Sequence, residues 1–358
     1  MATVFRRARM QFFCFVTLAA TVFATSCTPA QEPPSLVGSR PLWSLTGATG
    51  WLNSKPLTAN DLKGKVVLVD FWTYSCINCL RSMPYVEAWA EKYKTSGLVV
   101  IGVHSPEFGF EQQLPNVQKA LRKYGIGFPV ALDSRMAIWN GFHNEFWPAD
   151  YFIDASGKVR YEHFGEGDYP REEQWIQKLL RERGATAMPG GTVDAQGEGA
   201  EAATDLTRIE SPETYIGYAR AQRFASHGGI APDATRLYAL PKHLWQNEWG
   251  LSGKWADRGQ FAVLEAPGGS IAFRFHARDL HLVLGPAADG KPIRFRVLLD
   301  GAAPGNDHGA DIDAAGNGVV RSYRLYQLIR QRGGAKKDRT FTIEFEDPGV
   351  QAFAFTFG

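Results

Sequence analysis

Short apolar runs alternate with amphipathic stretches in the first half of the chain. Runs of strand length occupy residues 66–71, 98–104, 128–132, 149–153 and 158–163. Stretches with helical periodicity occupy residues 77–93, 111–123 and 171–183. The last two strands are joined through the turn Ser156-Gly157 and form a hairpin. Strands that alternate with helices and end in a hairpin predict an α/β domain, with a central mixed sheet flanked by helices, over residues 42–183.

The second half of the chain has a different pattern. Residues 184–205 are rich in Gly and Ala and hold few large apolar side chains, so they form a linker that cannot bury a core. Beyond it, short β-branched and aromatic runs occupy residues 260–265, 270–276, 280–284, 293–299, 340–345 and 351–357. Several of these runs alternate apolar with polar residues and are separated by Gly-rich turns. This pattern predicts an all-β sandwich, jelly-roll-like, over residues 206–358.

The N-terminal segment has the composition of an export signal. Basic residues are followed by an apolar run at residues 12–23, which is shorter than a membrane-spanning helix requires. Small residues then precede Cys27, an arrangement that resembles the bacterial lipobox. We expect a signal peptide at residues 1–27, a tether at 28–41, and a protein exported to the periplasm or cell envelope that a lipid on Cys27 anchors to the membrane. Ordinary secretion with a free Cys27, or a single-pass anchor, are the alternatives.

Two of the four cysteines, Cys76 and Cys79, form a C-x-x-C motif between an apolar strand and a helix. A helix N-terminus favours a thiolate, the reactive form of cysteine, so Cys76 is placed to attack a disulfide. Cys79, one helical turn later, can resolve the resulting mixed disulfide. A zinc half-site is a less favoured interpretation of the motif, because a structural zinc site needs four ligands and the sequence holds no second C-x-x-C or close His pair. A purely structural disulfide would close too small a loop to constrain the unfolded chain much.

Two further features surround this motif. Asp70 lies within the apolar strand before Cys76, where a carboxylate is costly without a partner or a role, and a buried carboxyl can act as a base toward a nearby thiol. A solvent-facing Asp70 is the alternative. Trp147-Pro148 stands directly before the strand at 149–153, and an aromatic residue before Pro makes a cis bond more frequent, although trans remains the commoner form.

These residues resemble the thioredoxin superfamily, and most closely its exported, membrane-tethered TlpA/ResA-like thiol-disulfide oxidoreductases. The resemblance implies a thioredoxin-like fold over residues 42–183. It makes Cys76 the attacking and Cys79 the resolving cysteine, and Asp70 the buried acid that exchanges a proton with Cys79. It assigns a substrate-binding groove to Trp72, Trp147 and the cis-proline Pro148, and a helix kink to Pro84. Ile77-Asn78 replaces the Gly-Pro of thioredoxins, so the redox potential stays open.

The C-terminal half resembles the module that follows the thioredoxin domain in DipZ-type proteins, in segments such as RLYQLIRQ and DPGVQAFAFTFG. This resemblance implies a CcdA/DsbD-like membrane protein as electron donor and disulfide-containing exported proteins as substrates. We therefore expect an envelope thiol-disulfide oxidoreductase that works as a reductant.

Two alternative functions remain open. A peroxiredoxin-like thiol peroxidase would agree with Thr73 three residues before Cys76, but Val69 stands where peroxiredoxins have a proline. A binding protein for cell-wall glycan would use the β-sandwich as a carbohydrate-binding-module-like domain. Its aromatic platform would consist of Trp245, Trp249 and Trp255, although tryptophans of a sandwich core have the same pattern.

Charge and the remaining motifs add little to this picture. The formal net charge of +2 gives no reason to expect a polyanionic partner such as nucleic acid. No glycine-rich phosphate loop is present in the sequence, and we expect neither an organic cofactor nor a metal. His104 ends the strand at residues 98–104 and Glu107 lies just after it; both are candidates either for a substrate groove or for capping the loop.

Overall fold

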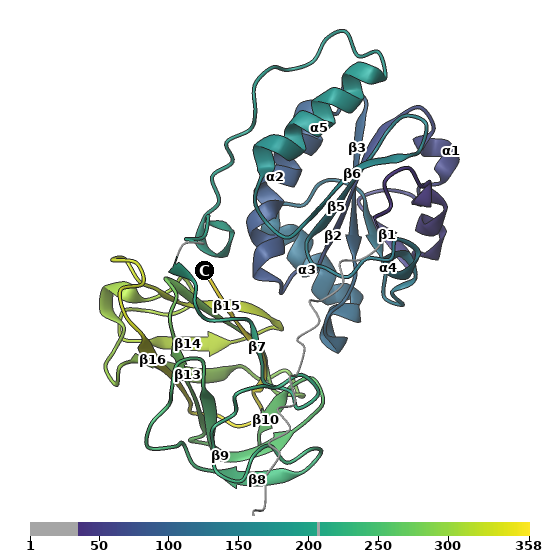
Figure 1. Ribbon diagram of the computed structural model, residues 1–358. Coiled ribbons are helices and arrows are strands. Elements are labelled where there is room, and N and C mark those ends of the chain that lie inside the picture. Colours follow the sequence, from purple (N-terminus) through teal and green to yellow (C-terminus); the bar gives the residue numbers. More distant parts are fainter. Residues whose placement is uncertain (1–34, 206–207) are drawn as a thin grey trace, which may run out of the picture. The chain divides into compact units, whose positions relative to one another are not determined.

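The computed structural model describes residues 35–205 and 208–358 (Figure 1). Its first part is a sheet of six strands in the order β1-β4-β3-β2-β5-β6. The strands are β1 (Gly50–Leu52), β2 (Val66–Trp72), β3 (Leu98–His104), β4 (Val130–Leu132), β5 (Ala149–Ile153) and β6 (Val159–Phe164). The β2·β3 and β3·β4 pairs are parallel and the other pairs are antiparallel. The predicted mixed sheet and its hairpin are thus confirmed.

Helices cover both faces of this sheet. They are α1 (Ala59–Leu62), α2 (Ile77–Tyr93), α3 (Leu114–Tyr124), α4 (Ala137–Gly141) and α5 (Tyr169–Glu182), with 3₁₀ turns at Pro41–Gly47 and Gly109–Gln112. On β2, Leu68 packs with residues of α2, α3 and α5, whereas the next residue, Val69, packs with residues of α1 and α4. This alternation follows from the two-residue period of a strand.

Two element boundaries differ from expectation because of proline. The helix expected from residue 111 begins at Leu114, since Pro115 occupies a first-turn position that suits a proline and the preceding turn is 3₁₀. The strand expected from residue 128 begins at Val130, because Pro129 cannot donate to the ladder.

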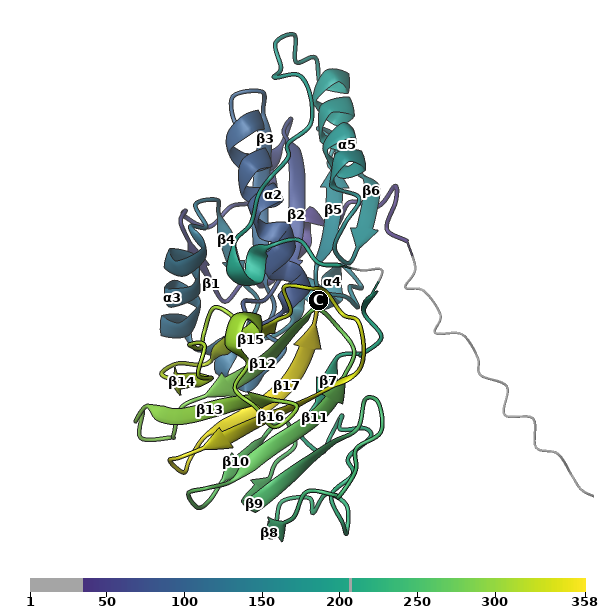
Figure 2. The same cartoon turned by 90° about the vertical axis from the view of Figure 1, so that its left-hand side faces the viewer.

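The second part, from Thr214 to the C-terminus, is built from antiparallel ladders alone. Its strands are β7 (Thr214–Tyr215), β8 (Thr235–Tyr238), β9 (Trp249–Asp257), β10 (Ala262–Leu264), β11 (Ser270–Phe275), β12 (Asp279–Gly285), β13 (Ile293–Leu299), β14 (Asn317–Val320), β15 (Arg324–Arg330), β16 (Arg339–Phe345) and β17 (Gln351–Phe357). Nine of them follow the order β14-β13-β16-β11-β9-β10-β17-β12-β15, while β7 pairs with β17 and β8 with β9 (Figure 2). The predicted all-β architecture is confirmed.

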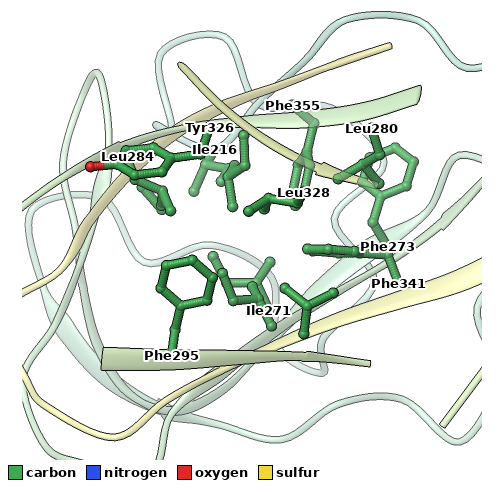
Figure 3. Packing of buried hydrophobic residues seen from close by; sticks show 14 of the residues in the cluster. Ile216, Ile271, Phe273, Leu280, Leu284, Phe295, Tyr326, Leu328, Phe341 and Phe355 are labelled. Carbon is green, nitrogen blue, oxygen red and sulfur yellow. The ribbon is translucent and has the colours of Figure 1, made fainter. Parts of the chain in front are cut away.

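Strand β9 lets this sheet curl over itself. Its first half, Trp249–Ser252, pairs with β11, and its second half pairs with β8 and β10. Gly253, at the change of partner, has a φ of +96°, a conformation that a side chain disfavours. The two halves of the sheet then face each other across an apolar core. Figure 3 shows Ile271 and Phe295 from β11 and β13 opposite Leu284, Leu328 and Phe355 from β12, β15 and β17.

The outer face of the curled sheet is also apolar in places. On β17, Phe355 belongs to the sandwich core, whereas Phe353 points the other way and packs at 5.2 Å and 4.7 Å between ring centroids from Phe108 and Phe110. Val283 of β12 and Leu325 of β15 are buried in the same cluster as these two rings. The α/β domain and the β-sandwich therefore share one buried apolar cluster.

None of the helices in residues 35–205 and 208–358 is long and apolar enough to cross a membrane. The expected signal peptide with Cys27, and the first half of the expected tether (residues 28–34), lie outside the described residues.

Candidate active site

The two cysteines lie at the start of α2, as the spacing predicts. Cys76 is the N-cap residue, and the backbone N–H of Cys79 donates to its Sγ at 3.4 Å. A helix N-terminus stabilises negative charge on a side chain in this position. Cys76 is partly exposed and Cys79 is fully buried, and both are free thiols. Cys76 is thus the sulfur that a substrate disulfide can reach.

The loop before β5 lies against Cys76. The Trp147–Pro148 peptide bond is cis, and the Cys76 thiol points at the Trp147 carbonyl oxygen at 3.8 Å. The Trp147 ring is held from two sides, because its Nε1 donates to the Ser105 carbonyl at 3.0 Å and its centroid lies 4.1 Å from that of Trp139. The geometry thus places Trp147 beside the attacking sulfur, as the resemblance to thioredoxins implies, with Pro148 buried directly after it.

Asp70 is buried in β2, with 1% of its surface exposed. The alternative of a solvent-facing side chain is therefore wrong. Neither carboxylate oxygen has a hydrogen-bond partner among the described residues, and burial raises the pKa of Asp70 to about 7. Burial also raises the pKa of the Cys79 thiol, with smaller contributions from Cys76 and Asp70. Asp70 is therefore close enough to influence Cys79, and it can take up or release a proton near neutral pH.

Three further titratable groups, which the sequence analysis did not identify, lie on the Asp70 side of the sheet. Asp150 of β5 stands directly opposite Asp70, and His163 of β6 stands directly opposite Asp150. Glu172, in the first turn of α5, has its Oε1 3.4 Å from the His163 Nε2. The signal that identifies Asp70, a carboxyl within an apolar strand, also applies to Asp150. Glu172 gives no such signal, since an acidic residue in a first helical turn is common on surfaces.

A further carboxyl that was not predicted, Glu111, organises the loop that carries the cysteines. It is fully buried, accepts a hydrogen bond of 2.6 Å from the Ser75 hydroxyl, and also accepts from the backbone N–H groups of Glu107 and Phe108. Burial raises its pKa to about 7. Ser75 directly precedes Cys76, so Glu111 holds the attacking cysteine in place through its neighbour.

A cleft of about 580 Å³ opens in front of Cys76. Its walls include residues of both domains: Cys76, Ile77, Asn78, Arg81, Glu107, Glu145, Phe146, Trp147, Glu166, Ile209, Ser211, Glu213, Tyr215, Arg220, Thr356 and Phe357. Arg81 is paired with Glu166 at 2.9 Å, and Arg220 with Glu107 at 2.8 Å. Glu107 also accepts from the Tyr215 hydroxyl at 2.7 Å. Of the two loop candidates, Glu107 lines the cleft while His104 is buried.

Two of the expected binding groups need correction. Trp72 is fully buried in the apolar cluster of the α/β domain and does not line the cleft, because the two-residue period of β2 turns it toward the helices. Trp249 and Trp255 are fully buried in the sandwich core on β9. Only Trp245 of the expected aromatic platform is exposed, so the three rings do not form one surface.

Known proteins are similar to this chain over both domains. Residues 43–179 match the Redoxin family, and residues 211–358 match the family described as thioredoxin like C-terminal domain. Protein DipZ of Mycobacterium bovis is 39% identical over 345 residues, which are 93% of this chain and 45% of DipZ. The chain thus spans less than half the length of this relative.

Smaller relatives match the first domain. Thiol-disulfide oxidoreductase ResA of Bacillus thuringiensis is 31% identical over 128 residues, which are 36% of this chain and 71% of ResA. The solution structure of a thioredoxin-like protein in the oxidized form, 31% identical, covers 42% of this chain and 99% of its own, with a TM-score of 0.38. The chain therefore belongs to the redoxin family of thiol-disulfide oxidoreductases, of the DipZ and ResA type, with a thioredoxin-like C-terminal domain after its redoxin domain.

Proposed function

We propose that this protein is a reductant of the cell envelope, which reduces disulfide bonds in exported proteins. The Cys76 thiolate attacks one sulfur of the substrate disulfide, and the other substrate sulfur leaves as a thiolate. Cys79 then loses its proton and attacks Cys76 in the mixed disulfide. This second step releases the remaining substrate sulfur as a thiolate and leaves the Cys76–Cys79 disulfide, so two electrons have passed to the substrate.

The observation that carries the direction of electron flow is the set of buried carboxyls behind the dithiol. A pair becomes a strong oxidant when its reduced form is stabilised, chiefly as a thiolate. Here Asp70, Asp150 and Glu172 lie in the interior on the side of Cys79, whose own pKa burial raises. Negative charge among them disfavours a second negative charge on sulfur. The reduced pair then gains little stabilisation from a Cys79 thiolate, which supports a reductant rather than a strong oxidant.

The envelope location and the electron donor rest on the sequence. The basic and apolar N-terminal segment ending at Cys27 favours export and lipidation, and the similarity to DipZ favours a CcdA/DsbD-like membrane protein as donor. Substrate recognition would use the cleft in front of Cys76. Since Tyr215, Arg220 and Phe357 of the C-terminal domain line it, this domain would help select the substrate.

The equilibrium redox potential of the Cys76–Cys79 pair tests the direction. We expect a value near that of thioredoxin, about −270 mV, in dithiothreitol or glutathione buffers. A value near that of DsbA, about −120 mV, would mean that the protein inserts disulfides instead.

Variants of the two cysteines test the reaction itself. Cys76→Ser should abolish turnover, whereas Cys79→Ser should accumulate mixed disulfides with exported proteins, visible on non-reducing gels with an envelope extract. A Cys79→Ser protein that traps no substrate would contradict the proposal. Rapid reduction of hydrogen peroxide by the wild-type protein, with slow reduction of protein disulfides, would favour the thiol peroxidase instead.

A further inference from the structure

A row of titratable side chains leads from the active site to the edge of the sheet. Asp70, Asp150 and His163 occupy directly facing positions on β2, β5 and β6, three strands that lie side by side in Figures 1 and 2. Directly facing residues of antiparallel strands project from the same face, with Cβ atoms about 4.5–5.5 Å apart. β6 is the outermost strand at this end of the sheet. The row therefore runs from the interior to an edge.

The row lies on the face of the sheet that α2 and α5 cover, which is the face that Cys79 packs against. The neighbours of Asp70 on the same face of β2, Leu68 and Trp72, pack in one cluster with Cys79 and with residues of α2 and α5. Glu172, in the first turn of α5, adds a fourth group to the row, because its Oε1 lies 3.4 Å from the His163 Nε2. One helix and three strands thus bring four titratable groups together.

These groups have few other interactions. Both oxygens of Asp70 and of Glu172, the Oδ1 of Asp150 and the Nε2 of His163 have no hydrogen-bond partner among the described residues. Buried polar atoms in proteins are nearly always hydrogen-bonded, so a cluster of unpartnered ones calls for an explanation. A structural role would pair each carboxyl with a cation or a backbone N–H, as Glu111 is paired in this same domain. A role in moving protons needs the groups to be free to exchange them.

The reaction requires such a path. Cys79 must lose a proton before it resolves the mixed disulfide, yet Cys79 is fully buried and Asp70 is 1% exposed. Asp70 can accept the Cys79 proton but must pass it on before the next turnover. The His163 side chain is 18% exposed and is the first member of the row that reaches solvent.

We propose that Asp150, Glu172 and His163 act through Asp70 as a proton relay that carries the Cys79 proton to solvent at the edge strand β6. The Cys79 thiol transfers its proton to the Asp70 carboxylate as the Cys76–Cys79 disulfide forms. Asp150 and Glu172 pass a proton to His163, directly or through water, and His163 releases it. The path runs in reverse when the disulfide is reduced. The inference rests on the dithiol–disulfide exchange proposed above, in either direction.

The charges around the row suit this exchange. Burial raises the pKa of Asp70 to about 7 and of Glu172 to about 9, and it raises the pKa of Asp150 as well. Three adjacent carboxyls cannot all be ionised, so they share protons near neutral pH. The other charged groups that face the row come from the start of α5. Asp168 raises the pKa of Glu172, and Asp168 and Arg171 act in opposite directions on His163, whose pKa burial lowers.

The test measures the second chemical step alone. Reduced protein is mixed with a disulfide-containing peptide, samples are quenched in acid, and the decay of the mixed disulfide is followed from pH 5 to 9. We expect His163→Ala to slow this decay about tenfold near pH 7, and the rate to become proportional to hydroxide or buffer base. Added imidazole should restore it. The rate at which iodoacetamide alkylates Cys76 should stay unchanged, since the relay serves Cys79.

Asp150→Asn and Glu172→Gln should give the same change in pH profile without rescue by imidazole. Glu162→Gln is the matched control, because it removes a carboxyl from the next position of β6, on the opposite face. A wild-type pH profile in a folded His163→Ala protein, or a loss of rate that neither imidazole nor buffer base restores, would overturn the relay. Because His163 lies at an edge, this variant keeps the test decisive even if Asp150→Asn fails to fold. A wild-type protein with no disulfide exchange at all would instead overturn the proposed function.

Discussion

Asp70 combines a cost in stability with a use in chemistry. Its pKa is about 7 in the folded protein against 3.8 for an ordinary aspartate, because burial disfavours the charged form. The folded state therefore binds this proton more tightly than the unfolded state does. At pH below 3.8 Asp70 is protonated in both the folded and the unfolded state and costs no stability. Its destabilising effect grows as the pH rises from 3.8 to about 7 and is complete above that. A carboxyl kept at such a cost agrees with a role in proton exchange.

Asp70→Asn should therefore make the protein more stable and less active. At pH 8 we expect the free energy of unfolding to rise by a few kcal/mol, since one pKa unit corresponds to about 1.4 kcal/mol. At pH 4 the difference should nearly vanish, which provides an internal control. Urea denaturation at the two pH values measures both. Equal stability of the variant and the wild type at pH 8 would show that Asp70 is not held in a costly environment.

Strand β9 shows how one element decides the shape of a domain. It pairs with β11 along its first half and with β8 and β10 along its second half, and so it belongs to both halves of the curled sheet. Its tryptophans, Trp249 and Trp255, fill the core on the two sides of the bend. The bend itself falls at Gly253, where a Cβ would lie 2.8 Å from the Cα of Gly269. Neither the strained φ nor this close approach tolerates a side chain.

Gly253→Ala should consequently destabilise the C-terminal domain, by about 2 kcal/mol or more, through the positive φ and the clash with the backbone of Gly269. Ser252→Ala, one position earlier on the same strand, is the control and should change stability by less than about 0.5 kcal/mol. Thermal unfolding of both variants measures the difference. A Gly253→Ala protein as stable as the control would mean that the bend does not depend on glycine.

The two domains are joined by more than the linker. Phe353 on the outer face of β17 packs against Phe108 and Phe110 of the segment that follows β3. The same segment holds Glu111, which bonds to Ser75 beside the attacking cysteine. The C-terminal domain therefore contacts the segment that orders the active-site loop, and it supplies part of the cleft wall.

Phe353 and Phe355 allow this coupling to be tested with two residues of one strand. Phe355→Ala opens a cavity in the sandwich core and should lower stability by about 3–5 kcal/mol. Phe353→Ala should leave the sandwich core intact but weaken the contact between the domains. In calorimetry we expect one unfolding transition for the wild type and two separate transitions for Phe353→Ala. A single transition at the wild-type temperature in Phe353→Ala would contradict the coupling.

Local information was enough for the longer elements of the redoxin domain and for its sulfur chemistry. The strand Leu98–His104 and the end of α2 at Tyr93 coincide with the predicted ranges, because apolar periodicity is a property of neighbouring residues. The C-x-x-C spacing likewise places Cys76 and Cys79 on one helical turn whatever surrounds them. Strand β9 itself is absent from the predicted ranges, since Gly and charged residues interrupt its apolar pattern.

The surroundings of the cysteines, by contrast, depend on residues far apart in the chain. Asp70 meets Asp150 and Glu172 because β2, β5 and α5 pack together, and pairing across eighty or more residues leaves no local pattern. The same holds for Trp249 and Trp255, since an aromatic side chain on a surface and one in a core look alike until the sheet curls around it. The chain's own pattern thus specifies which sulfur chemistry is possible. Burial and long-range packing set the proton affinities that govern it.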